Sequence, residues 1–373
     1  MERRKFLKTL AVSTVAPWLG TLTGLRAAVQ RPIIAMGVEH KITTIPIPGV
    51  EEFTMPTAGI RTDTRTGMTK NGDLYVGGGG FLWKSTDRGA TWTQRKLPIR
   101  AAGGFGILNG DVFVLVSYTD GHSLNEVRLS TDYGETWGDP ARLDIAPFDH
   151  GGGGWSDVYQ HPDGSAMITV TLRNKATRFQ FHDHIYRSTD GGRTWGDRTL
   201  LVAYSAESSL LALPDSKRML AYIRAQRPPL SDDPSDFTQQ TGTRENNPWP
   251  LKNGVLAESN DKGRTWTNLR LVDTYGSVPG ELIQAPDGRI AALWLLRYPY
   301  EQAGIRVRLS SDDGHSWGRE TYSLCAGHGY PSSVVYADGT IVTACESTRL
   351  SSRGRPVGER TMGAVRWRLP EEC

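Results

Sequence analysis

Cysteine is scarce in this chain, and its charges nearly balance. The three cysteines, Cys325, Cys345 and Cys373, lack the spacing of a metal-ligand motif, so we expect neither a metal nor a cofactor. The sequence carries 43 basic and 40 acidic side chains, a formal net charge of +3. A balance this close to neutrality gives no indication of nucleic-acid binding. Low-complexity tracts and linker-like stretches are also absent, which favours a single folded domain.

The first 28 residues differ from the rest of the chain. Arg3 and Arg4 precede a mostly apolar run at residues 9–25, and small residues follow at Ala27 and Ala28. This pattern resembles a twin-arginine export signal, which predicts a periplasmic or secreted protein of residues 29–373. A membrane anchor is the alternative, although the run contains a proline and two glycines. The leader holds five of the bases and one of the acids, leaving 38 against 39, so we expect no membrane affinity after its removal.

One short phrase, Ser-x-Asp-x-Gly-x-Thr-Trp, is repeated along the chain, once with Ser in place of Thr. Its five copies are Ser85–Trp92, Ser130–Trp137, Ser188–Trp195, Ser259–Trp266 and Ser310–Trp317. In each, the Asp can accept hydrogen bonds from nearby backbone N–H groups, the Gly supplies a positive φ, and the Trp returns the chain to apolar packing. Repetition at this spacing indicates one recurring supersecondary unit. The phrase resembles the Asp-box (BNR repeat) of the sialidase, or neuraminidase, superfamily.

A second signal alternates with the Asp-boxes. Short turns, mostly Asn-Gly or Asp-Gly, each precede a strand-like apolar run; they lie at residues 71–72, 109–110, 163–164, 215–216, 287–288 and 338–339. Six antiparallel repeats, the last without a box, predict an all-β fold, a six-bladed β-propeller. We expect residues 31–47 to supply the outer strand that the sixth blade lacks, and thereby to close the ring.

The order of strands within a blade predicts which face carries chemistry. Hairpin turns and Asp-boxes fall at one end of the strands, so the boxes are structural, and the other end forms the mouth of the ring. Counting back from each turn gives the residues that begin the first strands: Asp63, Ala101, Trp155, Glu207, Pro279 and Tyr330. Counting forward gives three arginines at the ends of second strands: Arg173, Arg224 and Arg297. Charged side chains converging on a mouth must be paired or must bind a ligand.

The resemblance to sialidases extends to these residues. Glu207 to Arg224 is similar to the sialidase segment that carries the glutamate partner of the nucleophile and an arginine of the substrate-binding triad. Tyr330, eight residues before Asp338, is similar in position to the nucleophilic tyrosine, and Arg297 resembles a second triad arginine. The resemblance implies a glycoside hydrolase in which Glu207 takes the proton of Tyr330 and arginines grip the carboxylate of an acidic sugar.

The first half of the chain departs from the family. Arg61 and Arg65 lie near the start of the first blade without the Arg-Ile-Pro motif of sialidases, and residues 77–84, where the family places its acid/base aspartate, contain no carboxylate. Asp63 or Asp157 is the replacement that we consider as proton donor. Arg61, Arg173, Trp155 and Asp157 complete the predicted substrate-binding set.

Three further expectations remain open at this level. The partner is a glycan or glycoconjugate, and we expect a monomer; the alternative is a non-catalytic propeller that binds glycan or protein. The insertion at residues 225–253 is either a wall of the site or an inert surface loop. Cys325 and Cys345 either pair in an oxidising compartment or remain buried thiols.

Overall fold

The structure is a computed structural model. It describes residues 43–56, 64–98, 102–119, 123–152, 155–176, 181–214, 217–226, 252–273, 277–297, 302–327, 329–346, 349–350, 356–357 and 361–371. The predicted leader (residues 1–28) and most of the insertion at 225–253 lie outside these ranges, as do Arg61 and Asp63. All regular elements of the described residues are β-strands, and no helix among them has the length and hydropathy of a membrane span.

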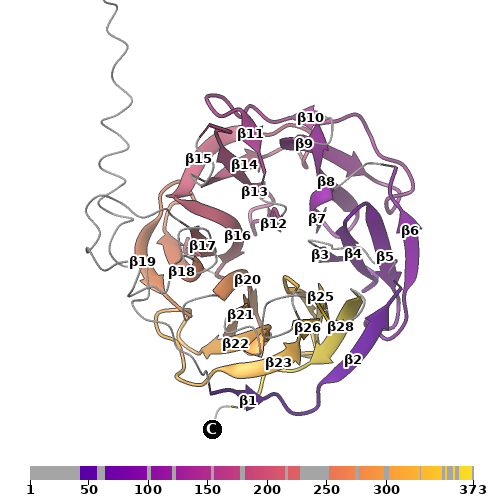
Figure 1. The fold of residues 1–373 in the computed structure, drawn as a ribbon. Coiled ribbons are helices and arrows are strands. Elements are labelled where there is room, and N and C mark those ends of the chain that lie inside the picture. Colours follow the sequence, from indigo (N-terminus) through magenta and orange to yellow (C-terminus); the bar gives the residue numbers. More distant parts are fainter. Residues whose placement is uncertain are drawn as a thin grey trace, which may run out of the picture.

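The strands form six antiparallel blades arranged around a central axis (Figure 1). The innermost strands of blades one to six are β3 (Arg65–Met68), β7 (Ala102–Leu108), β12 (Val158–Gln160), β16 (Ser205–Ala212), β20 (Ser277–Gln284) and β24 (Ser332–Val335). The second strands are β4 (Leu74–Gly78), β8 (Val112–Thr119), β13 (Ala166–Arg173), β17 (Met219–Gln226), β21 (Ile290–Leu296) and β25 (Ile341–Glu346). These second strands coincide with the apolar runs after the predicted turns, so the expected six-bladed propeller is confirmed.

The third and outer strands complete each blade. The third strands are β5 (Phe81–Ser85), β9 (Ser123–Ser130), β14 (His182–Ser188), β18 (Lys252–Ser259), β22 (Gly304–Ser310) and β28 (Met362–Trp367). The outer strands are β6 (Thr93–Lys96), β10 (Ala141–Arg142), β15 (Gly196–Ala203), β19 (Thr267–Leu271), β23 (Tyr322–Ala326) and β2 (Glu51–Met55). Three further short strands are β11 (His150–Gly151), which pairs with β13, and the pair β26 (Arg349–Leu350) and β27 (Pro356–Val357).

An N-terminal strand closes the ring, but it is not the segment that the sequence suggested. β2, at residues 51–55, pairs antiparallel with β28 and so completes the sixth blade, where the indigo and yellow ends of the chain meet in Figure 1. The described end of the predicted segment, β1 (Ile45–Pro46), instead adds to the fifth blade, parallel to β23. The prediction for residues 31–47 was therefore wrong by one strand, because two N-terminal strands cover two adjacent blades.

Each Asp-box folds as the local chemistry predicts. In the first box, the Ser85 hydroxyl donates to Asp87 and accepts from the Gly89 N–H (2.8 Å each), while the Thr91 N–H and hydroxyl both donate to Asp87. The box glycine has a φ of 84°. Box residues also contact the hairpin turn of the preceding blade, as in the Arg88–Asp338 ion pair at 2.6 Å. Boxes and hairpin turns therefore lie on the same face of the ring.

Six apolar clusters join neighbouring blades. Between the sixth and first blades, for example, Val342 packs with Leu74, and between the fourth and fifth, Leu220 packs with Ile290. A box tryptophan packs against each of five clusters; these are Trp92, Trp137, Trp195, Trp266 and Trp317. The cluster between the fifth and sixth blades has Trp155 and Trp367 instead, because the sixth repeat has no box.

Candidate active site

Glu207 lies on the innermost strand of the fourth blade in an unusual backbone conformation. Its φ is 54°, a region that side-chain-bearing residues seldom adopt. The conformation belongs to a β-bulge between Ala206 and Ser209, where β16 has one residue more than β17. The Glu207 N–H donates to the Thr171 hydroxyl of the third blade at 3.3 Å. Such local strain is found preferentially at functional sites, because surrounding structure must maintain it.

Tyr330 comes from the sixth blade and meets Glu207 directly. The Tyr330 hydroxyl donates to Glu207 Oε2 at 2.7 Å, and both side chains are buried. Arg224, on β17, donates to the same carboxylate oxygen and to the Tyr330 oxygen, the latter at 3.2 Å. Burial alone would lower the pKa of Arg224, but the charges of Glu207, Tyr330 and Asp183 together raise it. A tyrosine, a carboxylate and an arginine thus share one buried hydrogen-bonded cluster.

A column of stacked side chains supports the Tyr330 ring. The Trp155 ring lies 5.3 Å from it, at an interplanar angle of 30°, and the Arg65 guanidinium lies over the Trp155 ring at 3.3 Å from its centroid. Arg297, which follows β21, lies 5.2 Å from the Tyr330 ring centroid. Cations over aromatic faces are attracted by the ring quadrupole. Trp155 is only 1% exposed, so in this conformation it supports Tyr330 and presents no open face for a sugar.

Asp157 connects this column to the bulge. One of its oxygens lies 3.4 Å from an Arg65 nitrogen, and the other accepts the Leu210 N–H at 2.8 Å. Burial lowers the pKa of Arg65, against the opposing charges of Asp157, Glu281 and Glu207. Asp157 is thereby fixed between the third and fourth blades, with its side chain 14% exposed.

Two further carboxyl groups are buried close to the cluster. Asp183 accepts hydrogen bonds from the hydroxyls of Thr171 and Ser208, and burial raises its pKa to about 6. Glu281, on β20, accepts from the Ser333 N–H at 2.9 Å and from its hydroxyl. Burial raises the pKa of Glu281 to about 7. Both groups accept hydrogen bonds from hydroxyls, and desolvation by burial outweighs these bonds in setting their pKa values.

The structure brings together most of the residues that the sequence selected. Tyr330, Glu207, Arg224, Arg297 and Trp155 meet at the mouth, and Asp157 borders them through Arg65. The two remaining first-blade candidates, at positions 61 and 63, lie outside the described residues.

Arg173 is placed differently from that group. It ends β13 with its guanidinium 5.3 Å from the Phe181 ring, on the third blade. The sequence reasoning assigned no role to Arg65, Asp183 or Glu281. Arg65 and Glu281 lie two residues after the predicted strand starts at positions 63 and 279, so the two-residue period of a strand is the signal that identifies them.

The mouth end of the first blade has no loop. β4 and β5 are joined by Gly79 and Gly80 alone, with φ values of 57° and 83°. This is the stretch in which the sialidase resemblance called for an acid/base aspartate, and the tight glycine turn provides no side chain there. A proton donor, if there is one, must come from another element.

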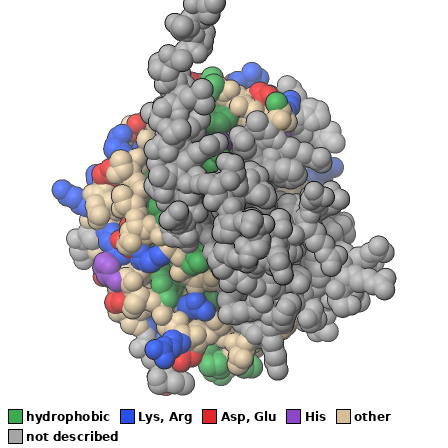
Figure 2. All heavy atoms as spheres, turned by 60° about the vertical axis from the view of Figure 1, so that its left-hand side comes forward, with side chains coloured by type: hydrophobic (Ala, Val, Ile, Leu, Met, Phe, Trp, Pro, Cys, Tyr) green, Lys and Arg blue, Asp and Glu red, His purple; other side chains and the backbone are tan. Residues whose placement is uncertain are grey.

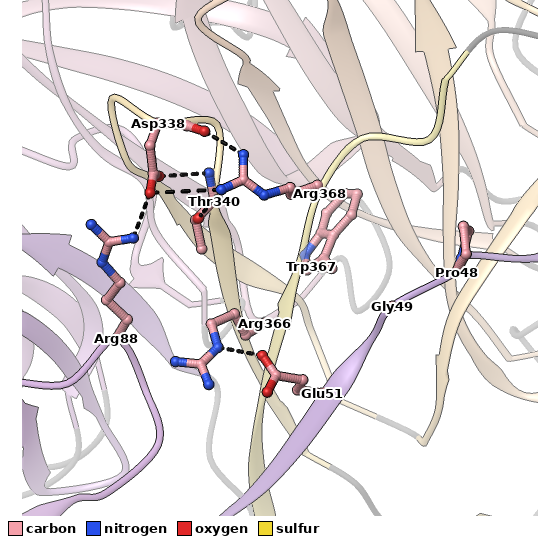
Figure 3. A pocket seen from close by; sticks show the side chains of 9 residues that line it. All are labelled: Pro48, Gly49, Glu51, Arg88, Asp338, Thr340, Arg366, Trp367 and Arg368. Atoms are coloured by element: carbon pink, nitrogen blue, oxygen red, sulfur yellow. Dashed lines mark hydrogen bonds and ion pairs between the residues drawn. The ribbon is translucent and has the colours of Figure 1, made fainter.

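A separate pocket lies on the box face, at the rim of the sixth blade. Its volume is about 410 Å³. In Figure 3, Arg366 is directed at Glu51, and both Arg88 and Arg368 are directed at Asp338. These ion pairs are partly exposed, and Figure 2 shows basic and acidic side chains similarly interspersed over the described part of the flank. The two carboxylates of this pocket are paired with arginines, so we do not select it as the catalytic centre.

Comparison with known proteins agrees with this architecture. Residues 111–344, more than half of the chain, match the family model described as a BNR repeat-like domain. A xyloglucanase from Paenibacillus sp. is 27% identical over 277 residues, which cover 58% of this chain and 26% of that protein. The chain thus spans about a quarter of the length of this relative.

Solved structures show the same fold at low identity. A protein of unknown function from Dyadobacter fermentans superposes with a TM-score of 0.64 at 16% identity, covering 87% of this chain and 100% of that one. A Hadza microbial sialidase gives 0.56 at 14% identity, covering 82% and 65%. The Trypanosoma rangeli sialidase in complex with the inhibitor DANA gives 0.56 at 13%, covering 86% and 60%. The chain therefore belongs to the BNR repeat-like family, with the six-bladed propeller fold of sialidases.

Proposed function

We propose that this protein is a glycoside hydrolase that removes a terminal acidic sugar, with Tyr330 as nucleophile and Glu207 as its base. One observation carries the proposal: the Tyr330 hydroxyl donates to a buried glutamate at 2.7 Å. A nucleophile hydrogen-bonded to a base that a third group orients is the general arrangement of covalent catalysis, and Arg224 is that third group. The xyloglucanase relative and the sialidase neighbours support a glycosidase-like protein.

The reaction follows from the charges at the mouth. An acidic sugar carries a carboxylate, which would repel an anionic nucleophile, whereas the neutral phenol of Tyr330 is not repelled. As the phenol oxygen attacks the anomeric carbon, its proton passes to Glu207 and the glycosidic C–O bond breaks. Water then hydrolyses the glycosyl–tyrosine bond. Arg297, beside the Tyr330 ring, is the arginine that we assign to the sugar carboxylate.

The leaving oxygen needs a proton donor. Asp63 and Asp157 are the two candidates, and Asp157 is held by Arg65 and by the Leu210 N–H. Replacing Asp157 with Asn tests its role. If Asp157 is the donor, the variant should still turn over aryl glycosides with an activated leaving group but lose turnover of substrates with a poor leaving group. An activated leaving group departs without protonation.

Two observations favour a second function, glycan binding without cleavage. The turn at Gly79 and Gly80 removes the first-blade loop of the resemblance, and Arg224 is already engaged by Glu207. A binding propeller needs neither a proton donor nor an ionisable tyrosine. The two functions therefore predict different effects of removing the Tyr330 hydroxyl.

The deciding experiment measures turnover of aryl glycosides, including sialosides, by purified protein and its Tyr330→Phe variant. The glycosidase proposal expects loss of turnover by at least about a hundredfold with ligand binding largely kept. Tyr336→Phe is the matched control, since Tyr336 lies on the same blade with its hydroxyl 3.4 Å from Gly72 O. Absence of turnover on every substrate, with glycan binding unchanged in Tyr330→Phe, would favour the binding propeller.

We also propose export through the twin-arginine route, on the strength of Arg3, Arg4 and the apolar run that follows them. Replacing both arginines with lysine is expected to retain the precursor in the cytoplasm. Unchanged accumulation outside the cytoplasm would refute this assignment.

A further inference from the structure

Two thiols face each other across one blade interface. Cys325 lies on β23, the outer strand of the fifth blade, and Cys345 lies on β25, the second strand of the sixth. Their sulfur atoms are 3.7 Å apart, and both residues are buried at 6% and 1% exposure. Rotation of the two cysteine side chains about their Cα–Cβ bonds can bring the sulfurs closer without movement of a whole blade. The contact is therefore close to disulfide geometry.

The interface that holds the thiols differs from the other five. Each of those contains the tryptophan of an Asp-box, whereas the sixth repeat ends without a box. The cluster here includes both cysteines, together with Tyr330, Trp155 and Trp367. This junction lacks the Asp-box turn that contacts the preceding blade at the other five. A covalent link here would compensate for that missing contact.

The thiols also flank the segment that carries Tyr330. Cys325 precedes Tyr330 by five residues, and the Gly329 N–H donates to the carbonyl of Glu346, the neighbour of Cys345, at 3.1 Å. The approach of these backbones is close, since a Cβ on Gly329 would lie 2.1 Å from the Glu346 nitrogen. A link between the cysteines would therefore fix the chain on both sides of this contact.

We propose that Cys325 and Cys345 form a disulfide that joins the fifth and sixth blades. The oxidant is a small-molecule or protein disulfide. One cysteine thiolate attacks it to give a mixed disulfide and releases one thiol; the second cysteine thiolate then displaces the other thiol. The two cysteines together lose two protons and two electrons, and the oxidant disulfide is reduced to two thiols.

Formation of the link is slow in the folded protein. Contact with Cys325 and burial raise the pKa of the Cys345 thiol well above its ordinary value, so little thiolate is present. Exchange in either direction, to form or to reduce the bond, then requires local opening of the interface. The link constrains the unfolded chain between the two positions, which raises thermal stability.

The test equilibrates the purified full-length protein in glutathione buffers, oxidised or reduced, and then quenches, denatures and alkylates it for peptide mass mapping. The expected result in oxidised buffer is one cross-linked peptide pair containing Cys325 and Cys345, with Cys373 alkylated. The melting temperature of this form is expected to exceed that of the reduced protein by about 5 °C. Dithiothreitol should abolish the difference.

Variants locate the effect. Cys373→Ser should keep the redox-dependent melting shift, and Cys345→Ala should lose it. The comparison of oxidised with reduced wild-type protein needs no variant, so a variant that fails to fold leaves the test intact. Complete alkylation of Cys325 and Cys345 after equilibration with oxidised glutathione would overturn the proposal, as would cross-linking to Cys373.

Discussion

Two sets of carboxyl groups have pKa values shifted in opposite directions. The first set is the aspartates of the Asp-box turns, and the second is Asp183 and Glu281, which are buried beside the mouth. Asp87 in the first box accepts the Thr91 N–H at 2.8 Å and the Thr91 hydroxyl at 2.6 Å, and these bonds lower its pKa to about 2. Asp132, Asp261 and Asp312 in other boxes also have a pKa of about 2. At the mouth, burial raises the pKa of Glu281 to about 7 and that of Asp183 to about 6.

The difference shows how the effect of hydrogen bonds on a carboxyl pKa depends on whether the group is exposed to solvent or buried. A box aspartate is near water and receives donors from its own turn, so its charge costs little and is well stabilised. Asp183 and Glu281 receive hydroxyl donors from another strand or blade but lose their hydration, and desolvation outweighs the bonds. The box groups hold the fold at neutral pH; the mouth groups reduce its stability there and form the polar surroundings of Glu207.

The two sets therefore oppose each other in pH dependence. A box aspartate, with its folded pKa below the ordinary 3.8, contributes stability that is present above about pH 4 and lost as the pH falls towards 2. Glu281, with its folded pKa above the ordinary 4.5, binds a proton more tightly in the folded state. Its contribution to stability therefore declines as the pH rises from about 4.5 to 7.

The largest effect is expected from breaking the charge pair at the mouth. Arg224→Ala leaves Glu207 buried without the cation that donates to it, which should lower the free energy of unfolding by about 3–5 kcal/mol. Urea unfolding at pH 7 measures this. The double variant Arg224→Met with Glu207→Leu should recover much of the loss, because it removes both charges; no recovery would show that the pair is not the cause.

The next largest effect is expected from removing Glu281, whose pKa is raised by burial. Glu281→Gln removes a group that must ionise in a buried environment, so the variant should lack the part of the decline in stability that Glu281 causes between about pH 4.5 and 7. The wild type should lose about 1–3 kcal/mol relative to the variant over this range. Equal slopes for the two proteins in urea unfolding at several pH values would contradict the assignment.

A smaller effect of opposite sign is expected at a box. Asp87→Asn keeps the shape of the turn but weakens the bonds from Thr91, and because the side chain is exposed we expect a loss of only about 1 kcal/mol at pH 7. The loss should vanish near pH 2, where Asp87 is itself protonated. Asp132→Asn in the second box is the matched substitution, and a difference that persists at low pH would rule out the charge as its source.

The smallest effect is expected in the pocket of Figure 3. Arg366→Gln breaks an ion pair with Glu51, of which the acidic side chain is 56% exposed. Exposed pairs contribute little to the free energy of unfolding, and screening by 0.5 M salt should remove most of that contribution. A larger, salt-independent loss would indicate that Arg366 acts through its packing over Phe53.

Much of the fold was predictable because its signals are local. The boxes, the glycine turns and the second strands each depend on a few consecutive residues, and β21 (Ile290–Leu296) coincides with its predicted apolar run. The closing strand was not predictable in the same way. β1 and β2 are both short and largely exposed, and their distant partners, β23 and β28, decide which blade each one joins.

The sequence by itself determined the number of blades, the face that carries the Asp-boxes and the convergence of Glu207 and Tyr330, because strand direction and spacing are properties of the chain. The tertiary structure decided what those residues touch: Arg224 shared between them, Trp155 in contact with Arg65 and Tyr330, and Cys325 beside Cys345. Burial and hydrogen bonding at these places depend on neighbours about 90 or more residues away, or on the packing of one blade against the next. No short-range pattern in the chain encodes them.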